Sequence, residues 1–173
     1  MYSRGFTIVE IVITITIMGI LLVLAVVNLS SSQVNSRDAE RKGDIEAIAL
    51  HLESYYANES SGSQGQTSAG GTYPGTTQIA NATSIMPDID PKSLHAPNVS
   101  LDDPMSLTPA TNATQTVAGI SPSPTISQYV YQPLTKSGAL CATPTATDEC
   151  RKFNLYYRLE ADDTVYKVTS KNQ

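Results

Sequence analysis

The chain has 173 residues, of which 40% are hydrophobic, and a formal net charge of −5 at pH 7. This length allows one globular domain in addition to an apolar N-terminal run. The mildly acidic balance gives no general reason to expect nucleic-acid binding. Gly, Ser, Thr and Pro are frequent and Trp is absent, which favours a loop-rich extracellular domain over a large buried enzyme core.

The apolar run covers residues 6–29, and Glu10 is its only charged residue. As a helix it would be about 36 Å long, enough to cross a hydrocarbon core of roughly 30 Å. A secretory signal peptide, the competing interpretation, usually has a shorter apolar part of roughly 7–15 residues. The serines at residues 30–32 would then be its cleavage region. A carboxylate inside a membrane helix is expensive, so Glu10 is a candidate functional residue.

The pattern Gly-Phe-Thr-x-x-Glu at residues 5–10, followed by an unbroken apolar helix, resembles the class III signal of type IV pilins and their secretion-system relatives. The resemblance implies a leader of residues 1–5 that a prepilin peptidase removes on the cytoplasmic face. Cleavage would follow Gly5, and Phe6 would become the N-methylated N-terminus. Glu10 would then be the fifth residue of the mature chain, where the family has its glutamate.

The family packs these helices side by side in the core of a filament. There Glu10 would be neutralised by the free amine of Phe6 in an adjacent subunit, and the pair would set the axial register. A signal anchor with an interfacial glutamate is the alternative. The family often has a proline where Val27 stands, so melting of the helix during assembly would depend on Gly19 and on residues 28–32.

The basic residues near the membrane segment favour a membrane orientation opposite to the one that the leader implies. Arg37, Arg41 and Lys42 follow the apolar run, whereas Arg4 and the initiator amine precede it. Counted by the positive-inside rule, they weakly favour the opposite orientation. We give more weight to the leader and the cysteine pair, which place the N-terminus in the cytoplasm.

Residues 36–56 continue a helical pattern, with apolar side chains at spacings of three and four that form one face. We therefore expect one helix from residue 6 to about residue 58, with its second half packed against a head. The prolines between Pro87 and Pro124 exclude long helices and central strands. No metal site or cofactor is expected, because the aspartates there lack calcium-loop spacing and His95 lacks metal-ligand neighbours.

Three strands are predicted near the C-terminus, at residues 129–132, 153–159 and 165–169, where aromatic and β-branched residues dominate. Residues 161–164 form a hairpin turn between the last two. A small antiparallel sheet that covers the apolar stripe at residues 45–52 follows. Cys141 and Cys150 flank the loop between the first two strands and would form a disulfide outside the cytoplasm, free thiols being the alternative.

The expected fold is α+β, a long N-terminal helix packed against a small antiparallel sheet. Its parts are the leader at 1–5, the transmembrane and assembly helix at 6–29, the amphipathic helix at 30–58, a loop-rich αβ-region at 59–128 and the disulfide-containing sheet at 129–173. The chain has no nucleophile elbow, P-loop, dinucleotide fingerprint or His-containing metal motif, so no enzymatic activity is expected.

The resemblance implies a structural subunit of a type IV pilus, used for adhesion, twitching motility or DNA uptake. Its partners would be copies of itself in a helical filament, prepilin peptidase and an assembly platform in the cytoplasmic membrane, with no direct nucleic-acid contact indicated. The chain would be a single-pass membrane protein before assembly and extracellular afterwards. The alternatives are a pseudopilin of a type II secretion or competence system, and a monomeric membrane-anchored surface adhesin.

Overall fold

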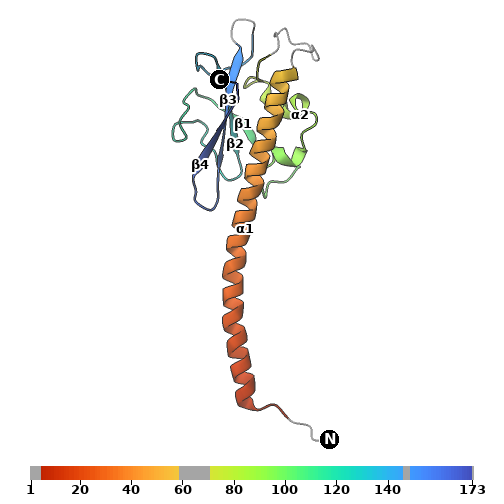
Figure 1. Ribbon diagram of the computed structural model, residues 1–173, viewed down its shortest axis with the longest axis vertical. Coiled ribbons are helices and arrows are strands. Elements are labelled where there is room, and N and C mark those ends of the chain that lie inside the picture. Colours follow the sequence, from red (N-terminus) through yellow and green to blue (C-terminus); the bar gives the residue numbers. More distant parts are fainter. Residues whose placement is uncertain (1–4, 59–70, 146–148, 173) are drawn as a thin grey trace. The chain divides into compact units, whose positions relative to one another are not determined.

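The computed structural model describes residues 5–58, 71–145 and 149–172. The chain divides into two compact units, residues 1–36 and 37–173. The elements in chain order are α1 (Ile8–Asn58), η2 (Ile79–Asn81), α2 (Ala82–Ile85), η3 (Pro91–Leu94), β1 (Leu107–Pro109), β2 (Tyr129–Thr135), β3 (Cys150–Arg158) and β4 (Val165–Thr169) (Figure 1).

In the first unit, the part of α1 from Ile8 to Val26 carries mostly apolar residues on every side. Two threonine hydroxyls are satisfied within the helix: Thr14 Oγ1 donates to the carbonyl of Glu10 at 2.7 Å, and Thr16 Oγ1 donates to that of Val12 at 2.7 Å. This internal bonding suits an apolar solvent, where an unpaired polar group costs several kcal/mol. By length and composition, α1 is the one helix among the described residues that could cross a membrane.

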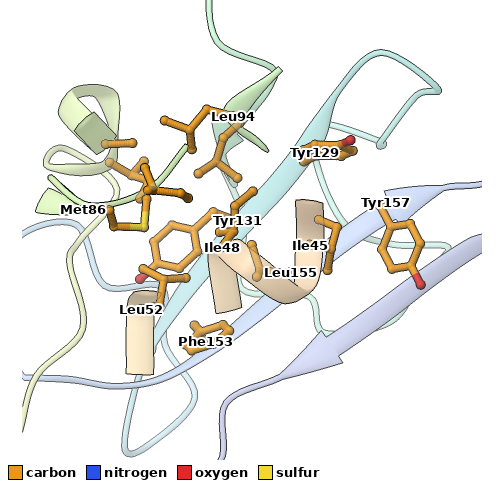
Figure 2. Close-up of a cluster of buried hydrophobic side chains, with 14 of the residues drawn as sticks. Ile45, Ile48, Leu52, Met86, Leu94, Tyr129, Tyr131, Phe153, Leu155 and Tyr157 are labelled. Carbon is orange, nitrogen blue, oxygen red and sulfur yellow. The ribbon is translucent and has the colours of Figure 1, made fainter. Parts of the chain in front are cut away.

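In the second unit, the later part of α1 packs on one face of the sheet. The predicted stripe is buried: Ile45, Ile48 and Leu52 are each at most 1% exposed. They lie in one cluster with the sheet side chains Tyr131 and Phe153 (Figure 2). The α+β fold is thus confirmed, and its core sits where the spacing of apolar residues predicted it.

The sheet has four strands in the order β1-β2-β3-β4. The pairs β2–β3 and β3–β4 are antiparallel, with Val130 opposite Tyr156 and Leu155 opposite Val168. β1 pairs parallel to β2, with Leu107 opposite Tyr129, so the sheet is mixed and the purely antiparallel prediction is wrong on this point. Three residues are too few to show alternation, and β1 occupies an edge, where a proline is tolerated.

The strand predictions are close to the observed bounds. β4 matches at residues 165–169, β2 continues to Thr135, and β3 begins at Cys150 and ends at Arg158. The face of the sheet away from α1 carries a second, smaller cluster in which Val130 and Tyr156 pack against Ala110 and Ile120. Part of the proline-rich segment therefore covers this face, which is why every residue of β2 is buried.

Candidate assembly site

The first turn of α1 is a capping box built from the Thr-x-x-Glu part of the N-terminal pattern. The backbone N–H of Glu10 donates to Thr7 Oγ1 at 3.2 Å, and that of Thr7 donates to Glu10 Oε2 at 3.5 Å. Reciprocal bonds of this type satisfy two amides that the helix itself leaves unpaired. The second bond is long, so the Thr7 side chain is the stronger cap. Glu10 thus has a local structural role that the sequence pattern already encodes.

The charge of Glu10 is not needed for this cap. A capping box accepts Gln as well as Glu, because only a hydrogen-bond acceptor is required. The helix dipole favours a carboxylate in the first turn by roughly 0.3–1 kcal/mol, which offsets part of its cost in an apolar medium. Glu10 is exposed, and it forms no ion pair within the part of the chain that the structure describes.

The helix around Glu10 presents apolar side chains on all sides. Those of the large hydrophobic residues from Phe6 to Val26, and that of Leu29, are between 49% and 84% exposed. A helix that is apolar all round needs either lipid or other helices around it. Gly5 and Phe6, the predicted cleavage and methylation residues, precede the helix; Phe6 is 79% exposed.

In the head, α1 is fixed to the β3–β4 loop by a group of four charged side chains, which we call the charge quartet: Arg37, Asp38, Arg41 and Glu160. Arg37 Nη2 lies 2.5 Å from Glu160 Oε1, and Arg41 Nη1 lies 2.7 Å from Asp38 Oδ1. The Asp38 carboxylate also accepts the backbone N–H groups of Glu160 at 2.8 Å and Ala161 at 2.9 Å. Two positive and two negative charges thus neutralise one another within one copy.

Arg41 is the most deeply placed member of the charge quartet, at 1% exposed. Its Nε donates to the carbonyl of Ile126 at 2.9 Å, so it joins α1 to a second loop. Burial raises the pKa of Asp38, but hydrogen bonds from Glu160, Ala161 and Arg41 outweigh this and lower it overall. Arg37 and Arg41 were counted against the predicted membrane orientation by the positive-inside rule. Both therefore have a structural role in the head.

A second acid of α1 is buried, and no cation among the described residues is bound to it. Asp44 is 7% exposed and accepts a hydrogen bond from Tyr129 Oη at 2.8 Å. Burial raises the pKa of Asp44 to about 6, although the bond from Tyr129 acts in the opposite direction. Glu40, one turn earlier on α1, also raises it, and forms its own ion pair with Lys92 at 2.7 Å.

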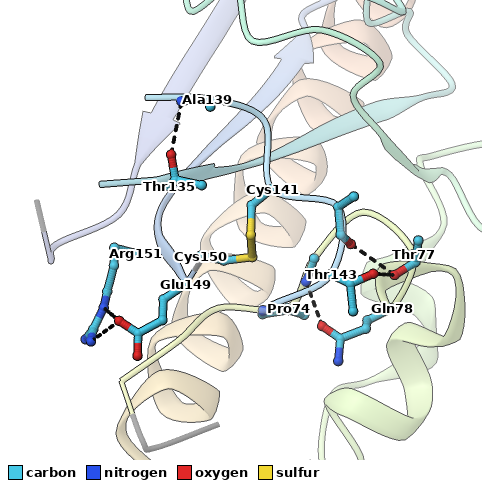
Figure 3. Close-up of a disulfide and its surroundings, with 12 residues drawn as sticks. Pro74, Thr77, Gln78, Thr135, Ala139, Cys141, Thr143, Glu149, Cys150 and Arg151 are labelled. Atoms are coloured by element: carbon cyan, nitrogen blue, oxygen red, sulfur yellow. Dashed lines mark hydrogen bonds and ion pairs between the residues drawn. A yellow bond between two sulfur atoms is a disulfide. The ribbon is translucent and has the colours of Figure 1, made fainter. Parts of the chain in front are cut away.

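The disulfide joins Cys141 and Cys150, with their Cα atoms 5.6 Å apart, as predicted (Figure 3). The backbone carbonyls of the two cysteines also bind residues 73–76, in the segment where the described chain resumes after α1. The N–H of Tyr73 donates to the carbonyl of Cys150 at 2.7 Å, and that of Thr76 donates to the carbonyl of Cys141 at 3.1 Å. Gly75 allows this close approach, because a Cβ there would lie 2.1 Å from the carbonyl oxygen of Ala142.

Two of the aspartates considered for metal binding have local structural roles. Asp90 accepts the N–H of Lys92 at 3.0 Å as the cap of η3, and Asp103 accepts that of Ser100 at 3.2 Å. Among the described residues, no group of three or more His, Cys, Asp or Glu side chains is placed to hold a metal ion. His95 is buried, and its Nδ1 has no hydrogen-bond partner in the part of the chain that the structure describes.

Sequence reasoning missed the charge quartet and the Asp44–Tyr129 bond. It described only the apolar side chains of residues 36–56 as one face, whereas Asp38, Arg41 and Asp44 are buried as well. The three-residue separation of Asp38 and Arg41 is a usable signal for an ion pair on a helix. No local signal connects either residue to Glu160, which lies more than a hundred residues further along the chain.

Comparison with known proteins gives one match. Residues 1–26 match the family model of the prokaryotic N-terminal methylation motif. No curated protein and no solved structure matches the chain. The N-terminal segment is therefore of the type IV prepilin type, with a class III leader, as its resemblance predicted.

Proposed function

We propose that this chain is a structural subunit of a type IV pilus. Prepilin peptidase removes residues 1–5 after Gly5, Phe6 is N-methylated, and copies of the chain assemble into a helical filament. The chain spans the cytoplasmic membrane once, with its N-terminus inside, until an assembly platform extracts it into an extracellular pilus. The methylation motif supports the prepilin type. Assembly into a pilus, and its use in adhesion, twitching motility or DNA uptake, is what we propose in addition.

The observation that carries the proposal is the charge of Glu10, which has no cation among the described residues although it lies on the apolar part of α1. The cap does not need this charge, and lipid disfavours it by roughly 2.5–3.5 kcal/mol near a helix centre and by less near the interface. Cleavage after Gly5 creates a free amine at Phe6 on every copy. In a bundle of such helices, the amine of one copy neutralises Glu10 of the next and fixes their axial offset.

Two variants separate capping from charge pairing. Glu10→Gln keeps an acceptor for the Thr7 amide but removes the charge, so it should insert normally and yield filaments at least tenfold less well. Thr7→Val removes the stronger cap and keeps the charge, so it should cost about 1 kcal/mol of helix stability and retain most assembly. The yield of sheared filaments measures both. Normal yield from Glu10→Gln would show that the charge has no role in assembly.

Mass spectrometry of the N-terminus tests the processing steps directly. The cellular protein should begin at Phe6 and carry one added methyl group on its α-amine. A protein that retains residues 1–5 and does not self-associate would instead be a membrane anchor, as in the adhesin alternative.

A pseudopilin of a secretion or competence system is the second candidate, because it would have the same N-terminal segment. Major secretion pseudopilins often have a calcium-binding loop near the C-terminus. Here Asp162 accepts hydrogen bonds from Thr164 and Tyr166, and Asp163 pairs with Arg158 at 2.8 Å. These carboxylates serve the β3–β4 hairpin itself, which favours the pilus. Filaments recovered from the cell surface, rather than assemblies confined to the envelope, would decide between the two.

A further inference from the structure

The segment that leads into β1 has an excess of exposed negative charge. In the described part of the chain, four of its carboxylates are exposed and form no ion pair: Asp88, Asp90, Asp102 and Asp103. We call them the acidic flank. Lys92 is the one lysine or arginine of the sequence between residues 71 and 128, and its Nζ lies 2.7 Å from Oε1 of Glu40 on α1.

Three lysines lie at the other edge of the sheet, where the carboxylates of Asp162 and Asp163 are bound within the β3–β4 hairpin. Lys152 on β3, Lys167 on β4 and Lys171 just after β4 form no ion pair among the described residues, and we call them the lysine edge. Lys167 pairs in register with Tyr156, so both lie on the face away from α1, and its Nζ donates to the neutral carbonyl of Gln115 at 3.2 Å. Glu53 binds the backbone N–H of Lys171 at 2.7 Å, not its side chain.

These two surfaces lie at opposite sides of the head and cannot neutralise each other within one copy. The acidic flank is tied to the β1 edge, because the N–H of Ser106, just before β1, donates to the carbonyl of Leu94 at 2.8 Å. The lysine edge lies at β3 and β4, the other end of the sheet order. Adjacent strands are about 4.8 Å apart, so the sheet alone separates β1 from β4 by about 14 Å. Figure 1 shows β4 and α2 on different sides of the head.

We propose that the acidic flank of one copy docks on the lysine edge of the next, so that the heads pair side by side in a fixed order. This inference rests on the proposed filament and names the contact between its heads. Two different, complementary surfaces on one chain make a heterologous interface, which propagates into an open helix when the rotation does not close. Opposite charges at such a contact mainly select orientation and register, since juxtaposed like charges are strongly disfavoured.

A polyanion such as a nucleic acid is the other occupant that the lysine edge could take. It would leave the acidic flank without a partner, and it would be opposed by the overall charge of −5. A second copy accounts for both surfaces at once, so it is the occupant that the charge distribution favours.

Cross-linking tests the contact without requiring filaments. A mixture of heavy-isotope-labelled and unlabelled full-length chains in membranes is treated with a carbodiimide, which joins a lysine amine directly to a carboxylate. We expect mixed-isotope peptides that join residues 88–103 to residues 152–171. Filaments without such peptides would overturn this inference and leave the proposed function standing. The same peptides in a protein that forms no filaments would do the reverse.

Charge reversal tests which surfaces meet. Asp102→Lys with Asp103→Lys, or Lys167→Glu with Lys171→Glu, should each lower the mixed-isotope cross-links and the filament yield several-fold. Combining the two pairs of reversals should restore most of both, and raising the salt concentration should weaken the unaltered contact. Glu46→Lys, a reversal at an exposed position of α1 outside both surfaces, is the matched control and should change little. Reversals without effect, loss equal to that of the control, or failure of the combined variant to recover would each refute the pairing. So would lysine variants that lose only nucleic-acid binding.

Discussion

The two parts of α1 treat charge in opposite ways. Near its amino end, Glu10 has a capping role but no cation among the described residues. In the head, Arg37, Asp38 and Arg41 are neutralised within the same copy, together with Glu160. The charges of the head part are satisfied within the fold, whereas the proposed function has Glu10 neutralised by another copy. Under that proposal, charge compensation distinguishes the segment that stabilises the fold from the segment that assembles.

The strongest test of this contrast is Arg41→Met. The change removes the cation that binds Asp38 and leaves the carbonyl of Ile126 without its donor. Breaking a buried ion pair from one side typically costs about 3–5 kcal/mol. We expect the lower end, because two backbone amides still bind Asp38. Urea unfolding of the full-length protein in detergent, followed by tyrosine circular dichroism, measures the loss.

The control for this variant is Lys42→Met, which removes the neighbouring positive charge of α1 from an exposed position. It should change the unfolding free energy by less than about 0.5 kcal/mol. If the two variants had equal unfolding free energies, the charge quartet would make no measurable contribution to the stability of the head.

The next largest effect is expected for the disulfide. Replacing Cys141 and Cys150 by serine opens a loop with a sequence separation of 9. Loss of the cross-link should lower the unfolding free energy by about 2–3 kcal/mol in the chain-entropy model. The damage should appear in the head alone, so membrane insertion should be unchanged while protease resistance of the head falls. Equal resistance of the reduced and oxidised protein would contradict this.

Some parts of this structure could be predicted from local pattern, and others could not. The stripe of Ile45, Ile48 and Leu52 follows from helical periodicity, and β4 from a short β-branched run that was found with its observed bounds. β1 was not predicted, because its three residues are too few to show the alternation of a strand and they pair with a strand twenty residues later. Parallel pairing of so short a segment is decided by tertiary contacts, not by propensity.

The candidate site divides in the same way. Glu10 stands out because a charge in an apolar run is conspicuous in the sequence alone. Glu160, the partner of Arg37, does not stand out in the sequence, because it is 123 residues away and reaches α1 only when the hairpin folds. Sequence patterns thus locate charges that are out of place locally, whereas charges satisfied over long distances become visible only in the folded chain.

Asp44 differs from the charge quartet because burial raises its pKa. The stability of the head should therefore depend on the protonation of Asp44. Its pKa of about 6 in the folded state lies above the ordinary value of 3.8, so burying the carboxylate costs stability above about pH 6. As the pH falls through 6 toward 4, protonation relieves this cost. Asp44→Asn keeps an acceptor for Tyr129, and we expect it to raise the unfolding free energy at pH 7.5 by about 1–2 kcal/mol. The gain should vanish near pH 4.

Asp38 gives the matched comparison, because its pKa is lowered in the folded state. Its stabilising contribution is present above its unfolded pKa and is lost as the pH falls through the folded pKa. Asp38→Asn should therefore be destabilising at pH 7.5, with the opposite sign to Asp44→Asn. Two asparagine variants that shifted stability in the same direction would argue against the different surroundings assigned to these carboxylates.

The smallest effects expected concern the two glycines in the middle of α1, one in each unit. A Cβ added at Gly19 or Gly43 would meet nothing within 4 Å in this copy. Glycine inside a helix costs about 0.5–1 kcal/mol relative to alanine, so Gly43→Ala should raise the stability of the head by about that amount. Gly19→Ala should leave the head unchanged, and should reduce filament yield if bending or close packing at Gly19 is needed for assembly. Loss of assembly with Gly43→Ala but not with Gly19→Ala would reverse the comparison, because the self-sufficient part of α1 would then be the one that depends on other copies.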